Sequence, residues 1–183
     1  MTDEALRLEQ RAGLPEALRV LLAEYPREGW KAHANFAGLV AFWLDRHLMF
    51  RQLTETLIRD AETRVDGGMD RQAYGQRLGR LGSMLVNQLH GHHQIEDMHY
   101  FPKLAGLETR LQRGFDLLDS DHHAMDGLLD RFTKFANGVL QGGEAGHFHT
   151  EVQGFTALLN RHLIDEEELI VPVILKYGAE GLE

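Results

Sequence analysis

The chain carries the stretch HGHHQIED at residues 90–97, in which Glu96 follows His92 by four residues. Residues four apart lie on one face of an α-helix, about one turn from each other. An imidazole and a carboxylate on an inner helix face are costly to bury unless they are paired or bind a metal. This stretch therefore predicts a helix whose inner face carries a binding site.

A second stretch, HLIDEEELIVP at residues 162–172, repeats the pattern with an offset of 70 residues. His162 and Glu166 are again four apart, and Pro102 and Pro172 each follow their glutamate by six residues. A single His-x-x-x-Glu occurs by chance on many solvated helices. Two copies at matched positions indicate two helical hairpins of similar design.

Apolar residues and histidines recur at spacings of three and four, a pattern typical of amphipathic helices. The pattern runs through four segments: 33–57, 74–99, 111–136 and 148–173. Within the second segment the predicted inner face passes through Gln88, His92, Ile95 and His99. Glycine pairs at 67–68 and 142–143 mark turns between segments. No run of alternating β-branched residues predicts a strand.

These segments predict an all-α protein, an up-and-down antiparallel four-helix bundle with a short helical N-terminal extension. The extension is expected over residues 1–29, with a helix that begins at Pro15 and ends before Pro26. The bundle is expected over residues 30–183. A chain of 183 residues is long enough to bury one core of ordinary size.

Four histidines, one on each predicted helix, are expected to lie at a common height in the bundle. Chain lengths between them and the predicted turns are similar, so short loops bring these rings into one layer: His47, His92, His122 and His162. A lone histidine on an apolar helix face is usually an ordinary core residue. Four unpaired imidazoles in one buried layer are costly, however, and a metal removes that cost.

Two carboxylates, Glu96 and Glu166, add to this predicted layer. Neutral imidazoles, together with carboxylates that bridge a pair of divalent ions, suit iron. The same donors also bind zinc or another divalent metal. The chain has no cysteine, which excludes thiolate zinc sites and iron–sulfur clusters. We therefore expect a cation site built from nitrogen and oxygen donors.

The charge balance is acidic, with 19 basic and 28 acidic side chains and a net charge of −9. This balance argues against a duplex nucleic-acid partner and against attraction to anionic lipid. No window approaches the roughly 20 uninterrupted apolar residues of a membrane span. Residues 1–10 lack the apolar region of a signal peptide. We expect a cytoplasmic protein.

The two His-x-x-x-Glu stretches, with their following prolines, resemble the second- and fourth-helix motifs of hemerythrin-like (HHE cation-binding) proteins. The resemblance covers about residues 30–177. It implies a four-helix bundle around a non-haem di-iron centre, with mostly histidine ligands and two bridging carboxylates, that binds or senses dioxygen. It also implies these ligands: His47, His92, Glu96, His122, and His162 with a following glutamate.

Two positions depart from the oxygen carriers of that family. Their third helix carries His-x-x-x-His, whereas Asp126 stands four residues after His122 here. Either Asp126 replaces the missing imidazole, or that iron keeps an open position or a water. Their last carboxylate stands five residues after the histidine, which is Glu167 here, but helix geometry favours Glu166. Both glutamates stay candidates, with Glu166 first.

The remaining histidines are expected to lie outside the site, and His90 and His93 point off the predicted inner face. The leading hypothesis is a protein that binds or senses dioxygen or a related small oxidant. A ligand at Asp126 would make the site richer in oxygen donors, so a di-iron oxidase or peroxidase is a second hypothesis. Iron handling and a metal-free helical scaffold are two further hypotheses.

Overall fold

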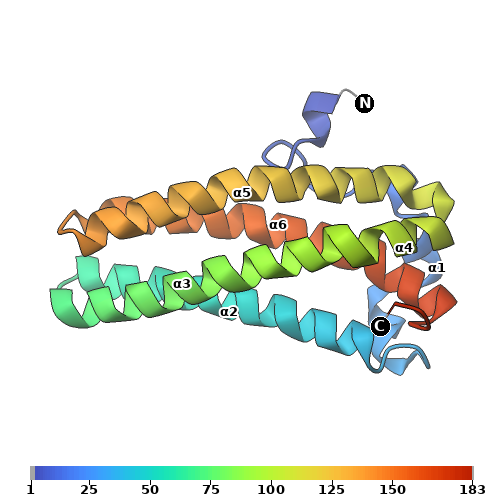
Figure 1. Ribbon diagram of the computed structural model, residues 1–183, viewed down its shortest axis with the longest axis horizontal. Coiled ribbons are helices and arrows are strands. Elements are labelled where there is room, and N and C mark those ends of the chain that lie inside the picture. Colours follow the sequence, from blue (N-terminus) through green and yellow to red (C-terminus); the bar gives the residue numbers. More distant parts are fainter. Residues whose placement is uncertain (1–2, 183) are drawn as a thin grey trace.

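The computed structural model describes residues 3–182, and this part of the chain is helical with no β-strand. Four long helices lie side by side (Figure 1): α2 (Leu39–Val65), α3 (Arg71–Ile95), α5 (Gln112–Leu140) and α6 (Ala145–Tyr177). Both α2 and α5 pack against α3 and α6, so the helices enclose a common core. The prediction of an all-α helical bundle is confirmed. None of the described helices is both long and apolar enough to cross a membrane.

The part before α2 consists of short helical turns. They are η1 (Asp3–Leu6), η2 (Glu16–Leu18), α1 (Val20–Glu24) and η3 (Arg27–Ala32). The helix expected between Pro15 and Pro26 is present as η2 followed by α1, and α1 packs against α6. Residues 1–2 and 183, at the outer ends of the predicted extension and bundle, lie outside the described residues.

The first long helix begins later than the sequence pattern predicts. His33 and Phe36, placed by the pattern on its inner face, both precede α2. Gly38 has a φ of 77°, a left-handed conformation that glycine adopts without steric cost. The chain turns at Gly38 and the helix begins at Leu39.

The end of α3 departs from a regular α-helix. The chain continues through a π-helical turn, η4 (Glu96–Tyr100), into α4 (Phe101–Leu107) and η5 (Thr109–Leu111). The Phe101 N–H donates to the carbonyl of Glu96, five residues earlier. Pro102 stands in the first turn of α4, where proline is tolerated. Such π-helical turns often occur at functional sites.

The inner face of α3 differs from the predicted one. Gln88, Ile95 and His99 are exposed, whereas His93 and Glu96 are buried. Since α3 packs against both α2 and α5, its buried face is set by two neighbours rather than by one apolar stripe. The prediction that His93 points away from the core is wrong.

A polar layer divides the core of the bundle into two apolar clusters. One cluster includes Trp43, Phe101 and Leu169, and the other includes Phe50 and Leu163. The buried polar residues between them are His47, His93, Glu96, Asp121, His122, His162, Asp165, Glu166 and Glu167. Burying such groups without partners is costly, so the contacts within this layer decide whether the bundle is stable.

Helices α5 and α6 approach closely at Gly114. A Cβ at this position would lie 2.6 Å from Cδ1 of Leu169, which is fully buried. This close approach sets the spacing of the two helices near the polar layer. The matched position Gly127, on the same helix, has nothing within 4 Å of an added Cβ.

We predict that Gly114→Val destabilises the protein by about 2 kcal/mol, because the added side chain must displace Leu169 in a packed core. Gly127→Val is expected to change the stability by less than about 0.5 kcal/mol, since that position is exposed. Urea unfolding followed by circular dichroism measures both. Equal stability of the two variants would contradict the close approach.

Candidate metal centre

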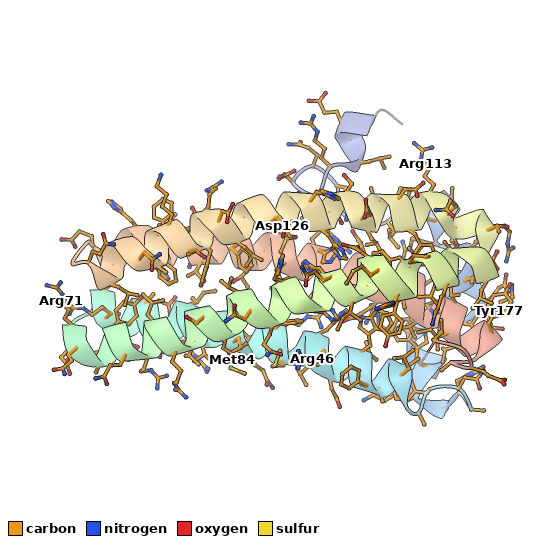
Figure 2. The ribbon with its side chains drawn as sticks, viewed as in Figure 1. Arg46, Arg71, Met84, Arg113, Asp126 and Tyr177 are labelled. Carbon is orange, nitrogen blue, oxygen red and sulfur yellow. The ribbon has the colours of Figure 1, made fainter. Side chains whose placement is uncertain are left out.

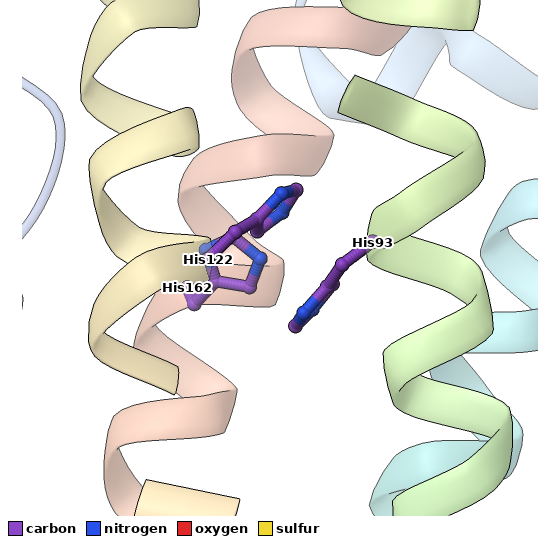
Figure 3. Close-up of side chains that lie close together, drawn as sticks. All are labelled: His93, His122 and His162. Atoms are coloured by element: carbon purple, nitrogen blue, oxygen red, sulfur yellow. The ribbon is translucent and has the colours of Figure 1, made fainter. Parts of the chain in front are cut away.

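Seven side chains meet in the polar layer as two adjacent groups. The two-histidine group joins α2, α3, η4 and α6 through His47, His92, Glu96 and Glu166. The three-histidine group joins α3, α5 and α6 through His93, His122 and His162 (Figure 3). In each group every member offers a donor atom within 4.8 Å of the others. The helices thus bring together nitrogen and oxygen atoms that could hold cations.

Glu96 belongs to the two-histidine group and also lies near the three-histidine group, at the start of the π-helical turn. Its Oε1 is 3.0 Å from Nε2 of His92 in the two-histidine group. Its Oε2 is 3.7 Å from Nε2 of His122 in the three-histidine group. One carboxylate therefore has an oxygen near each group.

Glu166 has the same arrangement on α6. Its Oε1 is 3.5 Å from Nε2 of His47, and its Oε2 is 3.3 Å from Nε2 of His162. The indole N–H of Trp43 donates to Oε1 of Glu96 at 2.7 Å and to Oε1 of Glu166 at 2.9 Å. Two carboxylates, each with one oxygen near each group, are arranged as ligands that could bridge two cations.

The rings of the three-histidine group lie in the space between α3, α5 and α6 (Figure 3). His93 stacks on His122, with ring centroids 4.0 Å apart and planes 11° apart. His162 meets both rings edge-on, with centroid distances of 5.3 Å to His93 and 4.9 Å to His122. The three imidazoles are therefore packed against one another inside the bundle.

Three of the histidines contact a carboxylate outside the two groups through Nδ1. These pairs are His47 with Glu167 at 3.0 Å, His122 with Asp97 at 2.7 Å, and His162 with Asp121 at 3.3 Å. A histidine whose Nδ1–H donates to a carboxylate presents the lone pair of Nε2 to a metal. The outer carboxylates thus set the orientation of these rings.

Several buried nitrogen and oxygen atoms that could bind a metal in this layer have no hydrogen-bond partner among the described residues. They are Oε2 of Glu96 and Glu166, Nε2 of His122 and His162, and both ring nitrogens of His93. An unsatisfied buried polar group costs roughly 1–3 kcal/mol. All of these atoms belong to the two groups. Cations bound between the histidines and glutamates would supply the missing partners, so the residues present fit a metal centre.

Burial and neighbouring charges shift the pKa values of several ionisable groups in this layer. Burial, together with the nearby Glu166 carboxylate, raises the pKa of Glu96 well above its usual value. Burial opposes ionisation of Glu166, but its interactions with His47, His162 and Glu96 together outweigh burial, and the pKa of Glu166 falls. Burial lowers the pKa of His92 to about 3 and also lowers that of His93. Both rings are therefore neutral, the state that binds metal.

The structure brings six of the eight predicted site residues into the two groups. These six are His47, His92, Glu96, His122, His162 and Glu166. Asp126 lies elsewhere, on α5 (Figure 2), with 57% of its side chain exposed and its Oδ1 3.6 Å from Nδ1 of His90. The inward position after His122 is taken by Met125, which is fully buried. Asp126 therefore does not occupy a position from which it could replace the missing imidazole as a ligand.

Glu167 lies directly behind His47 rather than within the two-histidine group. Its Oε1 contacts Nδ1 of His47 at 3.0 Å and accepts from Arg51 at 2.9 Å, while its Oε2 accepts from Arg27 at 2.7 Å. Burial opposes ionisation of Glu167, but the contacts with His47 and Arg27 lower its pKa to about 2. Of the two candidate glutamates, Glu166 lies in the group and Glu167 supports it from outside.

His93, Asp97 and Asp121 take part in the site and were missed by the sequence reasoning. The doublet of His92 and His93 was the available signal. Adjacent residues on a helix point about 100° apart, so a helix packed between two neighbours can present one residue to each. His92 contacts His47 on α2, whereas His93 is grouped with His122 on α5 and His162 on α6.

A pocket of 430 Å³ lies beside the two-histidine group, between α2 and α3. It is lined by Trp43, His92 and Glu96 where it meets the group, and by Phe42 and Gly91 farther away. None of the three-histidine group lines it. The pocket therefore reaches one side of the site only.

The family model described as Hemerythrin HHE cation binding domain matches residues 38–174. The matched range contains all seven residues of the two groups. No curated protein and no solved structure matches the chain. Both the sequence match and the buried histidine and glutamate groups lead to one assignment: the chain belongs to the hemerythrin HHE cation-binding domain family.

Proposed function

We propose that this is a hemerythrin-type protein that holds two iron ions and binds or senses dioxygen or a related small oxidant. The observation that carries the proposal is the position of Glu96 and Glu166, each with one oxygen near each histidine group. His47 and His92 would hold one ion, His93, His122 and His162 would hold the other, and Glu96 and Glu166 lie near both groups. When bound, the iron pair supplies reversible redox binding of the oxidant.

The residues around the ligands prepare the site for this task. Carboxylates on Nδ1 keep the Nε2 atoms turned inward, and Trp43 fixes the first oxygen of each glutamate. An apolar shell excludes bulk water, and it includes the buried residues Phe50, Leu85, Met125 and Leu159. Such a shell controls solvent access and the local dielectric constant.

The two sides of the site differ in the number of imidazoles. The side that the pocket reaches has His47 and His92, whereas the closed side has three histidines. The side with fewer protein ligands is therefore the side that small molecules can approach. We place the binding of dioxygen or a small oxidant there, with Trp43 and His92 at the inner end of the pocket.

We predict that His93→Ala reduces the iron content by about half, because it removes a donor from the three-histidine group. Asp126→Ala is the matched control and is expected to keep the full content, since that side chain lies at the surface. Anaerobic loading with ferrous iron, followed by air, metal analysis and absorption spectra, measures both. The unaltered protein is expected to develop charge-transfer bands on exposure to air.

A colourless protein that retains no iron would contradict the proposed function. If the protein binds zinc at full occupancy and takes up no iron, the metal of the site is zinc rather than iron, since the same donors bind zinc. If Asp126→Ala loses iron while His93→Ala keeps its full iron content, the proposed ligand set is contradicted.

A di-iron oxidase or peroxidase is the second candidate function, and the size of the pocket favours it. A cavity of 430 Å³ is larger than dioxygen requires and falls in the range typical of sites for small organic molecules. Phe42, Trp43 and Tyr100 give it aromatic walls. Steady consumption of peroxide by the iron-loaded protein would favour this function over reversible binding.

We predict that Gly91→Phe slows the reaction of the loaded protein with bulky organic hydroperoxides more than with hydrogen peroxide. An added Cβ meets nothing within 4 Å at Gly91, which lines the pocket, so a side chain can be added there without a clash at its Cβ. Gly79→Phe, on the same helix and equally free of contacts, is the matched control. Stopped-flow absorbance measures the rates. Equal rates in Gly91→Phe and Gly79→Phe would exclude this pocket as the entry route.

We further propose that the four long helices form an up-and-down antiparallel bundle over residues 30–183, with residues 1–29 as the extension. The alternating direction of the colour gradient along successive helices supports this topology (Figure 1). The lack of nucleic-acid and membrane partners stays a prediction from the acidic charge balance, and a cytoplasmic location also stays a prediction.

A further inference from the structure

The N-terminal segment, defined here as residues 3–37, precedes the range matched by the family model. Its start lies outside α5, and its later part reaches the end of the bundle where α1 and α4 lie (Figure 1). Two arginines of this segment, Arg11 and Arg27, contact carboxylates that in turn contact histidines of the metal centre. The carboxylate partner of Arg11 contacts the three-histidine group, and that of Arg27 contacts the two-histidine group.

Arg11 is buried between α5 and α6, with 8% of its surface exposed. Its guanidinium donates to Oδ1 of Asp121 at 2.8 Å, forms a second bond to Oδ2 of Asp121, and donates to Asp165 at 2.8 Å. Oδ2 of Asp121 lies 3.3 Å from Nδ1 of His162. A two-contact path therefore connects Arg11 to the three-histidine group.

Arg27 makes the corresponding path to the two-histidine group. Its Nη1 donates to Oε2 of Glu167 at 2.7 Å, and Oε1 of Glu167 lies 3.0 Å from Nδ1 of His47. Arg51 on α2 also donates to Glu167, at 2.9 Å. Glu167 therefore has a partner from the bundle as well as one from the N-terminal segment.

We infer that the N-terminal segment is a functional part of the metal centre, in which Arg11 and Arg27 are positioning residues for His162 and His47. The inference rests on the proposed function. A guanidinium that binds a carboxylate through two hydrogen bonds fixes its orientation. A buried carboxylate without a counter-charge is strongly destabilising. Arg11 makes two hydrogen bonds to Asp121 and Arg27 makes one to Glu167, so each arginine helps to hold its carboxylate against Nδ1 of one metal-binding histidine.

Metal binding and docking of the segment are then coupled. If docked arginines strengthen metal binding, bound metal must stabilise the docked segment by the same factor. The two paths end in different groups, but both His47 and His162 lie near Glu166, so the effects of the two arginines on metal binding should be coupled. A segment that only covers apolar surface would show neither effect. Leu14 and Leu18 of the segment are buried in the core, so deleting the segment would not separate the two roles.

The test uses substitutions in the full chain and zinc as a redox-inert probe. Arg11→Met and Arg27→Met keep an unbranched side chain and remove its charge. Arg19→Met is the matched control, because Arg19 belongs to the same segment, is 51% exposed and lies 3.7 Å from Glu168. Competition with a chromophoric chelator measures zinc affinity for each variant.

We expect Arg11→Met to weaken zinc binding on the order of 10-fold, as loss of outer partners of metal-bound histidines does. Arg27→Met should weaken it less, because Arg51 still pairs with Glu167. The double variant should bind zinc more weakly than either single variant, and Arg19→Met should bind like the unaltered protein. Affinities of Arg11→Met and Arg27→Met equal to that of Arg19→Met would overturn the inference while leaving the metal centre intact.

Hydrogen–deuterium exchange of the unaltered protein gives a second test that does not depend on the folding of the variants. Zinc should slow exchange in residues 11–33 as well as around the ligands. Unchanged exchange in residues 11–33, with slower exchange around the ligands, would overturn the inference alone. Failure of the unaltered protein to bind zinc or iron would overturn the proposed function and this inference together.

Discussion

The burial of carboxylates and imidazoles across the middle of an apolar bundle is the constraint on which the rest of the structure depends. Glu96 and Glu166 are almost fully inaccessible to solvent. Burying an ionised carboxylate without compensation is very costly, so the group must be protonated, paired or bound to a metal. Trp43 donates to one oxygen of each glutamate, and their other oxygens have no hydrogen-bond partner among the described residues. The layer is thus arranged to receive positive charge.

Support for this layer extends outward in successive contacts. Imidazoles surround the two glutamates, outer carboxylates contact the imidazoles, and arginines contact the outer carboxylates. Each contact fixes the orientation of the group inside it, and each buried negative charge gains a partner. The pocket lies on one side of this layer only, next to His92. The arrangement combines a rigid, closed three-histidine side with a two-histidine side open to small molecules.

The sequence predicted the helices and most of the inner ligands because both follow from local periodicity. A histidine and a glutamate four residues apart share a helix face whatever the tertiary structure is. The same reasoning failed for residues at the edge of a face. Asp126 is four residues after His122, yet Met125 takes the inward position and leaves Asp126 at the surface. On α3, packing against α2 and α5 buries His93, whereas His99, in the π-helical turn, is exposed.

By itself the sequence determined an all-helical chain and a site of nitrogen and oxygen donors, because helix periodicity and residue chemistry are properties of short stretches. Only the tertiary structure decided which of two adjacent residues faces which neighbour, as for His92 with His93 and for Glu166 with Glu167. It also decided the role of Arg11, whose partner Asp165 is 154 residues away. Contacts over such separations depend on how helices pack, and no local pattern records that packing.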